Sequence, residues 1–228
     1  MIIGNGLLAK AFNSYGNDNK LLIFASGVSN SNETSSKAFD REKKLLLDAL
    51  NNQSGKKFIY FSTCSMYDRY FEINAYTNHK LNIESMIQKL SENYTIVRLP
   101  QVLGVNNQHQ LMRFLYSAIK DNKTFDLFNI ERNVIDIEDV KLITSYIIKH
   151  DLFQNRIINI ANPKNIKVLD LVALLENILV VKSNYTVIDK IGSLDICIDE
   201  IKFIIDELDL FKGNYMEERV LKYCEKIN

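Results

Sequence analysis

The chain has 228 residues, 46% of them hydrophobic and 25% charged, and its formal net charge is zero. Such values are typical of a globular protein with one sizeable core, and they argue against nucleic acid or an anionic membrane as the main partner. The N-terminus lacks a signal-peptide pattern, and the most apolar later stretch, VLDLVALLENILVV, carries two acidic residues and is too short to span a bilayer. Cys64, Cys197 and Cys224 lie too far apart for a disulfide framework or paired metal ligands. We therefore expect a cytoplasmic protein with reduced thiols and no metal site.

Strands and helices alternate along the first part of the chain. Continuous apolar runs predict strands at 1–4, 20–27, 56–63 and 94–104, and apolar residues at helical spacing predict helices at 7–15, 36–50 and 76–93. This alternation predicts a parallel sheet with helices on both faces and with ligands bound at the carboxyl ends of the strands.

Beyond residue 104 the alternation is less regular. Helices are predicted at 108–121, 138–149 and 168–180, a strand at 156–162, and a final charged helix near 198–208. The expected fold is therefore α/β, a Rossmann-like doubly wound parallel sheet with a small C-terminal lobe.

The first strand is followed by a glycine turn, Gly4-Asn-Gly6-Leu-Leu-Ala9, that opens a helix. In this context the G-x-G-x-x-G/A pattern favours dinucleotide binding, because glycine lets the backbone approach a pyrophosphate. A strand–helix turn that merely needs a positive φ angle is the alternative.

Only the loop NSYGNDN separates the first helix from the next strand, so the usual second and third strands are missing. The acidic residue that normally binds the adenosine ribose is missing with them, and Asp18 has no strand to place it. We expect residues 1–104 to form a shortened dinucleotide-binding core, and residues 105–228 to complete the sheet and form the substrate lobe.

Tyr76 and Lys80 lie one turn apart on a predicted helix, after a strand that ends at Thr63. Spacing alone is weak, because a chain with 11 tyrosines and many lysines has about one Tyr-x-x-x-Lys by chance. Tyr116 and Lys120 form a second copy, which lacks such a strand and is interpreted as a solvated helix face. An ammonium beside Tyr76 would stabilise its phenolate and lower a pKa that is ordinarily about 10.

Together these segments resemble, in order, the extended short-chain dehydrogenase/reductase family, in its NAD-dependent epimerase/dehydratase branch that acts on nucleotide sugars. The matching segments include GNGLLA, LLIFASGVSNS, FIYFSTCSMYD, YTNHK, IVRLPQVLG and RNVIDIEDV. The resemblance spans roughly residues 1–180.

The resemblance implies a general acid/base, Tyr76, with Lys80 as its partner and Thr63 as the ligand of the substrate hydroxyl. It implies NAD or NADP as cofactor, bound by Gly4, Asn5, Gly6, Leu7, Leu8, Ala9, Ala25, Ser26, Gly27, Lys80, Pro100 and Val102. Gln101 and Arg132 would contact the substrate. Cys64 and Ser65 stand where family dehydratases carry Asp-Glu, so dehydratase activity is not expected.

Each of several side chains has a plainer interpretation. Cys64 could be a nucleophile, but a buried thiol is favoured because no histidine stands at a recognisable spacing. Arg132 could pair with Asp136 or Asp139 rather than face a phosphate. His79 is expected at the surface, and His109 and His150 are isolated.

The expected function is an NAD(P)-dependent reductase or epimerase of a nucleotide-activated keto sugar, serving surface polysaccharide biosynthesis. The apolar residues of the helices at 37–50 and 81–90 are expected to pack in the core. The resemblance implies that the same two helices also form a homodimer interface. The alternative is a non-catalytic member of the same fold that binds a nucleotide or nucleotide sugar.

Overall fold

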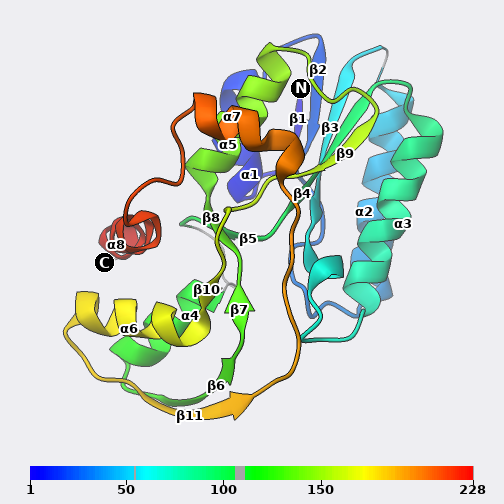
Figure 1. Cartoon of the computed structure of the whole chain (residues 1–228). Helices are drawn as coiled ribbons and strands as arrows, with labels where there is room; N and C mark the ends of the chain where they lie inside the picture. Colours follow the sequence, from blue (N-terminus) through cyan, green and yellow to red (C-terminus); the bar gives the residue numbers. More distant parts are fainter. Residues whose placement is uncertain (54, 106–110, 228) are drawn as a thin grey trace.

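A five-stranded parallel sheet forms the upper part of the molecule in Figure 1. The structure, a computed structural model, describes residues 1–53, 55–105 and 111–227. The strand order is β1-β2-β3-β4-β9, with the bounds β1 (Ile2–Ile3), β2 (Leu21–Phe24), β3 (Lys57–Thr63), β4 (Tyr94–Leu99) and β9 (Arg156–Asn159). Because every neighbouring pair is parallel, the carboxyl ends of the strands meet at one edge of the sheet.

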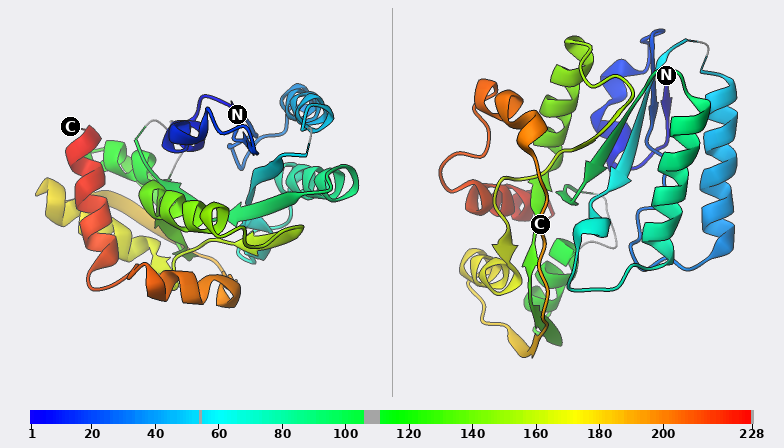
Figure 2. Two further views of the ribbon diagram at one scale, coloured as in Figure 1. Left: turned by 90° about the horizontal axis from the view of Figure 1, so that it is seen from above. Right: turned by 45° about the vertical axis from the view of Figure 1, so that its right-hand side comes forward.

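Helices cover both faces of this sheet, which is why its central strands carry long apolar runs on both faces. The helices α2 (Ser36–Asn51) and α3 (Ala75–Leu90) lie on one face, as Figures 1 and 2 show. The opposite face carries α1 (Leu7–Ala11), α5 (Ile137–Lys149) and α7 (Lys202–Glu207). Along β3, Phe58 and Tyr60 pack toward α2 and α3, whereas Ile59 and Phe61 pack toward the other layer.

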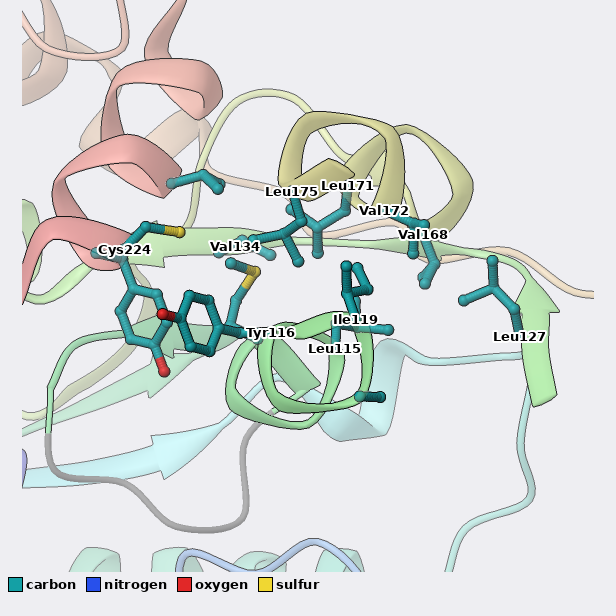
Figure 3. Close-up of a cluster of buried hydrophobic side chains, with 14 of the residues drawn as sticks. Leu115, Tyr116, Ile119, Leu127, Val134, Val168, Leu171, Val172, Leu175 and Cys224 are labelled. Carbon is teal, nitrogen blue, oxygen red and sulfur yellow. The ribbon is translucent and has the colours of Figure 1, made fainter. Parts of the chain in front are cut away.

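The lower lobe is built from short strand pairs and three helices. Its strands pair as β6 (Thr124–Asn129) with β11 (Asn184–Asp189), β7 (Glu131–Arg132) with β10 (Ile166–Lys167), and β5 (Gln101–Leu103) with β8 (Val134–Asp136). Its helices are α4 (Leu111–Lys120), α6 (Val168–Leu179) and α8 (Tyr215–Ile227). Side chains from all three helices meet in one apolar core, among them Leu115, Leu171 and Cys224 in Figure 3.

The predicted α/β fold with its shortened sheet is confirmed. Ile2 of β1 pairs directly with Ile23 of β2, and β1 is the edge of the sheet. Within the described residues, therefore, the two strands that usually extend the sheet beyond β1 are missing.

The element boundaries differ from the predictions in a few places. The strand predicted at 94–104 is divided at Pro100 into β4 and β5, because proline has no N–H to donate to a ladder. The helix predicted at 7–15 ends at Ala11 and continues as the 3-10 turn η1 (Asn13–Tyr15). The final predicted helix consists of η3 (Asp199–Ile201) and α7. Residues 108–110 of the helix predicted at 108–121, and His109 among them, lie outside the described residues.

The interpretation of Tyr116 as part of a solvated helix face is wrong. Tyr116 is buried in the core of the lobe, and Lys120 at the exposed end of α4 donates to its hydroxyl at 3.2 Å. In the described part of the chain, no helix has the length and apolarity needed to cross a membrane.

Candidate functional site

A cavity of about 690 Å³ opens at the carboxyl ends of the sheet strands and reaches the lobe. It brings together most of the residues predicted for a site: Gly6, Leu7, Leu8, Ala25, Gly27, Thr63, Tyr76, Lys80, Pro100, Gln101, Val102 and Arg132. The predicted cofactor residues that do not line it are Gly4, Asn5, Ala9 and Ser26. Ala9 is buried instead, and Ser26 accepts hydrogen bonds from the guanidinium of Arg41.

The two glycines of the first turn have different structural roles. Gly4 has φ +133°, and a Cβ added to it would lie 2.4 Å from the carbonyl oxygen of Ala25. Glycine is therefore required at Gly4 by the backbone angle and by the close approach of Ala25, the residue after β2. Gly6 has φ −77°, and an added Cβ would meet no atom within 4 Å. The positive-φ explanation thus applies to Gly4, whereas Gly6 faces open space at the cavity.

Tyr76 lies in the first turn of α3, which is fixed by a cap. The side chain of Asn74 accepts a hydrogen bond from the Thr77 N–H at 2.9 Å, as is typical of an N-cap. Tyr76 is 6% exposed and lines the cavity, and its hydroxyl has no hydrogen bond to any described residue. Thr63 is the last residue of β3, and its Oγ1 lies 2.8 Å from the Oγ of Ser65.

Lys80 is buried one turn after Tyr76 and has a carboxylate partner. Its Nζ donates to Oε1 of Glu42 at 3.1 Å and to the hydroxyl of Tyr60 at 2.8 Å. Tyr60 itself donates to the same carboxylate oxygen at 2.7 Å. The other oxygen of Glu42 lies 3.0 Å from Nε2 of His79 and accepts the N–H of Val28 at 2.7 Å.

This environment keeps Glu42 ionised although it is fully buried. Burial alone would raise its pKa, but Lys80, then His79 and the Val28 N–H, outweigh burial and lower the pKa to about 2. The pKa of Tyr60 is raised well above its ordinary value by burial and by the charge of Glu42. Tyr60 is therefore a neutral donor beside the Lys80–Glu42 ion pair.

Sequence reasoning missed Glu42 and Tyr60, and it placed His79 wrongly. The ring of His79 is buried, stacks on Phe39 with centroids 4.4 Å apart, and contacts Glu42. One signal was available: Glu42 stands one turn before Leu46 on the apolar stripe of α2, where a lone charge needs a buried partner.

A second buried ion pair lies further along α3. Glu84 binds Arg98 of β4 through two hydrogen bonds of 2.9 and 2.6 Å, and Ser62 donates to the same carboxylate. Cys64, beside this pair, is 2% exposed, and burial raises the pKa of its thiol above the ordinary value. The interpretation of Cys64 as a buried thiol is confirmed.

Arg132 reaches the cavity from the lobe. Its guanidinium pairs with Asp68 at 3.0 Å and lies over the ring of Phe71, 5.2 Å from the centroid. The suggested pairing with Asp136 or Asp139 is wrong, because Asp139 binds Tyr215 and Arg219. Burial lowers the pKa of Arg132. Asn133, from the RNVIDIEDV segment, also lines this end. Further lobe residues line it without any sequence motif that could have predicted them: Asp126, Phe128, Leu194 and Ile196.

Among the described residues, no group of three or more His, Cys, Asp or Glu side chains is arranged to hold a metal ion.

A family model described as the NAD dependent epimerase/dehydratase family matches residues 8–161. The chain therefore belongs to this family, which confirms the resemblance to extended short-chain dehydrogenases/reductases. No curated protein sequence matches the chain.

Solved structures share the fold over nearly the whole chain. UDP-N-acetylglucosamine 4-epimerase from Bacillus cereus matches with a TM-score of 0.70 and 17% identity, over 99% of this chain and 85% of that one. RMD from Pseudomonas aeruginosa, complexed with NADPH, matches with a TM-score of 0.76 and 14% identity, over 100% of this chain and 98% of that one. dTDP-glucose 4,6-dehydratase from Bacillus anthracis, in complex with NAD, matches with a TM-score of 0.70 and 11% identity, over 98% of this chain and 79% of that one. At these identities the likeness shows the fold alone.

Proposed function

We propose that the protein is an NAD(P)-dependent enzyme that reduces or epimerises a nucleotide-activated keto sugar, with Tyr76 as its general acid/base. The observation that carries the proposal is the convergence of Thr63, Tyr76 and Lys80 on one cavity at the carboxyl ends of the strands. Family membership supports the cofactor class, and the nucleotide-sugar epimerases among the similar structures support the substrate class.

The cavity suits the nicotinamide half of the cofactor better than the adenosine half. Gly6 leaves open space where a phosphate could approach the backbone, and Lys80 has a third N–H beyond those given to Glu42 and Tyr60. The carboxylate of Asp18, in contrast, accepts the Lys20 N–H and does not line the cavity. Asp18 is therefore no substitute for the usual ribose ligand.

Bound nicotinamide would supply or accept a hydride at the sugar carbon. The Tyr76 hydroxyl would give a proton to the oxygen on that carbon during reduction and take it back during oxidation. Thr63 would turn its hydroxyl from Ser65 toward the same oxygen. Arg132, whose guanidinium lies over the ring of Phe71, would bind the nucleotide diphosphate, in competition with the Asp68 carboxylate.

Tyr76→Phe tests the acid/base assignment. We expect it to remove most turnover of UDP- and dTDP-linked 4-keto sugars, at least about 100-fold, because general acid–base catalysis typically contributes that much. Binding of NADH or NADPH, followed by nicotinamide fluorescence, should stay within about twofold of wild type. Tyr116→Phe is the matched control, since Tyr116 belongs to the other Tyr-x-x-x-Lys pair and does not line the cavity. Wild-type turnover in the Tyr76 variant would end the proposal.

One observation favours a second function, binding of a nucleotide sugar without catalysis. The edge strand β1 has two residues, and among the described residues no strand lies beyond it to carry the usual acidic ribose ligand. Fluorescence titration with NADH and NADPH separates the two functions. Absence of binding at millimolar cofactor, together with thermal stabilisation by a nucleotide sugar, would favour the non-catalytic function.

A further inference from the structure

Arg41 is a cation at the end of the sheet where the proposed cofactor would run past β1. It lies on α2, which packs on the edge strand β1 from the face opposite to α1 (Figure 2). Its guanidinium donates to the carbonyl oxygen of Ser26 at 3.1 Å and to the Oγ of the same residue at 3.4 Å. Because Ser26 follows the carboxyl end of β2, the charge of Arg41 lies at the edge where parallel sheets bind their ligands.

Ser26 also places Arg41 beside the glycine turn. A Cβ added to Gly4 would lie 2.4 Å from the carbonyl oxygen of Ala25 and 3.1 Å from the backbone nitrogen of Ser26. The backbone after β2 is therefore in contact with the turn, and the next residue, Gly27, lines the cavity. Arg41 itself does not line the cavity. Its guanidinium is thus held just outside the cavity wall, next to the turn proposed for the pyrophosphate.

No carboxylate neutralises Arg41 among the described residues, because its only hydrogen bonds are those to Ser26. The adjacent Glu42 is buried and paired with Lys80. Glu33, in the loop before α2, accepts two backbone N–H groups of its own loop. Asp18 lies at the amino ends of the strands, where its carbonyl oxygen accepts a hydrogen bond from the N-terminal amino group.

The exposed face of α2 around Arg41 has a positive net charge. Lys37 and Lys44 lie one turn before and one turn after Arg41 on this face, and both are exposed. The acidic residues of the exposed surface of α2 are Asp48, two turns further along the same face, and Asp40, at its border. Three cations therefore face two carboxylates, and the cations lie nearer to the carboxyl ends of the strands.

A guanidinium in this place suits a phosphate better than a ribose hydroxyl. The ribose hydroxyl of NAD is normally held by an acidic acceptor, whereas the 2′-phosphate of NADP needs a cation. Arginine has no acceptor atom, and its planar fork can bind two phosphate oxygens at once. The two hydrogen bonds to Ser26 fix the orientation of the Arg41 guanidinium and leave further N–H groups for such a ligand.

We infer that Arg41 is a specificity-determining residue that binds the 2′-phosphate of NADP(H), so that the protein uses NADP(H) in preference to NAD(H). A helix on the far side of β1 thereby supplies the charge that the missing strands would otherwise carry. The inference rests on the proposed function and selects between the two cofactors that it leaves open.

Binding measurements test this inference without turnover. The Kd values of NADPH and NADH are measured by nicotinamide fluorescence, and those of 2′,5′-ADP and 5′-AMP by calorimetry. The two members of each pair differ only in the 2′-phosphate. Wild type should therefore bind NADPH and 2′,5′-ADP each at least about tenfold more tightly than the partner that lacks this phosphate.

Three variants assign the preference to Arg41. Arg41→Gln should weaken NADPH and 2′,5′-ADP at least about tenfold and leave NADH within about twofold of wild type. Arg41→Lys keeps the charge but not the planar fork, so its loss of NADPH affinity should be smaller than that of Arg41→Gln. Lys43→Gln is the matched control, because it removes one exposed cation from the opposite face of the same helix. It should leave all four ligands within about twofold of wild type.

Equal affinity of wild type for NADPH and NADH would overturn the inference. An equal loss of both cofactors in Arg41→Gln, or the same loss of NADPH in Lys43→Gln, would also overturn it. If Arg41→Gln does not fold, the comparison of 2′,5′-ADP with 5′-AMP on wild type still decides the question. Failure of the proposed function is seen separately: a protein that prefers NADPH but turns over no nucleotide sugar would refute that function and still support the role of Arg41.

Discussion

Gly4 and Gly6 show how two residues of one motif can serve different ends. Gly4 holds a backbone angle that side chains rarely adopt and lies against Ala25, so the fold needs it. Gly6 has ordinary dihedral angles and free space beside its Cα, so the fold does not require glycine at this position. A motif match alone cannot separate these roles, because both positions read as glycine in the sequence.

Alanine should therefore affect a different property at each position: the stability of the fold at Gly4 and the binding of the cofactor at Gly6. Gly4→Ala should lower the free energy of unfolding by about 2 kcal/mol or more, because it combines backbone strain with a steric clash. Gly6→Ala should unfold at the same denaturant concentration as wild type, yet bind NADH or NADPH at least about tenfold more weakly, because its methyl group fills space at the cavity. Urea unfolding and nicotinamide fluorescence measure the two effects. Wild-type cofactor binding by Gly6→Ala would contradict a pyrophosphate site at this turn.

Glu42 also gives the protein a specific sensitivity to acid. Its pKa is about 2 in the folded protein and about 4.5 ordinarily, so its ionisation stabilises the fold above pH 4.5. That stabilisation, about 3 kcal/mol in all, is lost as the pH falls from 4.5 toward 2.

The free energy of unfolding of Glu42→Gln should therefore fall furthest below that of wild type near neutral pH. The difference in unfolding free energy between wild type and this variant, measured by urea titration at pH 7, 5, 4 and 3, should begin to decrease below about pH 4.5. A gap that stays constant down to pH 3 would mean that the folded protein does not depress the pKa of Glu42.

At the scale of elements, local patterns explain what could be predicted from the sequence. The helices α2 and α3 were predicted within a few residues, because apolar side chains recur along them at helical spacing. The central strands were evident from their apolar runs. In contrast, β7 and β10 have two residues each and exist only because distant segments pair. Neither an apolar run nor a hydrophobic periodicity in the sequence could reveal strands this short.

The same distinction applies to the candidate site. Thr63, Tyr76 and Lys80 follow a strand end and a helical turn, so their convergence on one cavity could be expected. Glu42 contacts Lys80 across 38 residues of sequence, and nothing local links the two. Five lobe strands and α8 were not predicted, so that Arg132 was expected at the cavity without the elements that place it there: β6, β7, β8, β10 and β11.

At the scale of the molecule, the shortened sheet leaves the two halves of a dinucleotide with unequal support. The nicotinamide half would lie among Tyr76, Lys80 and the ends of β2 to β4, which line the cavity. The adenosine half would extend past β1, which is the edge of the described sheet. Because no described strand lies beyond β1 to carry a ribose ligand, most of the binding free energy should come from the nicotinamide half and the phosphates.

This asymmetry can be measured with a truncated cofactor. Reduced nicotinamide mononucleotide, which lacks the adenosine monophosphate portion, should bind with a Kd within about tenfold of that for NADH, a difference of about 1.4 kcal/mol. A full Rossmann sheet has a further strand with an acidic ribose ligand, so an enzyme of that kind should lose far more affinity on the same truncation. Fluorescence titrations of wild type, with Gly6→Ala as the variant that weakens both ligands, provide the comparison. NADH binding more than 100-fold tighter than the mononucleotide would show that other parts of the chain hold the adenosine, and the lobe and the loop after β2 would then be the places to search.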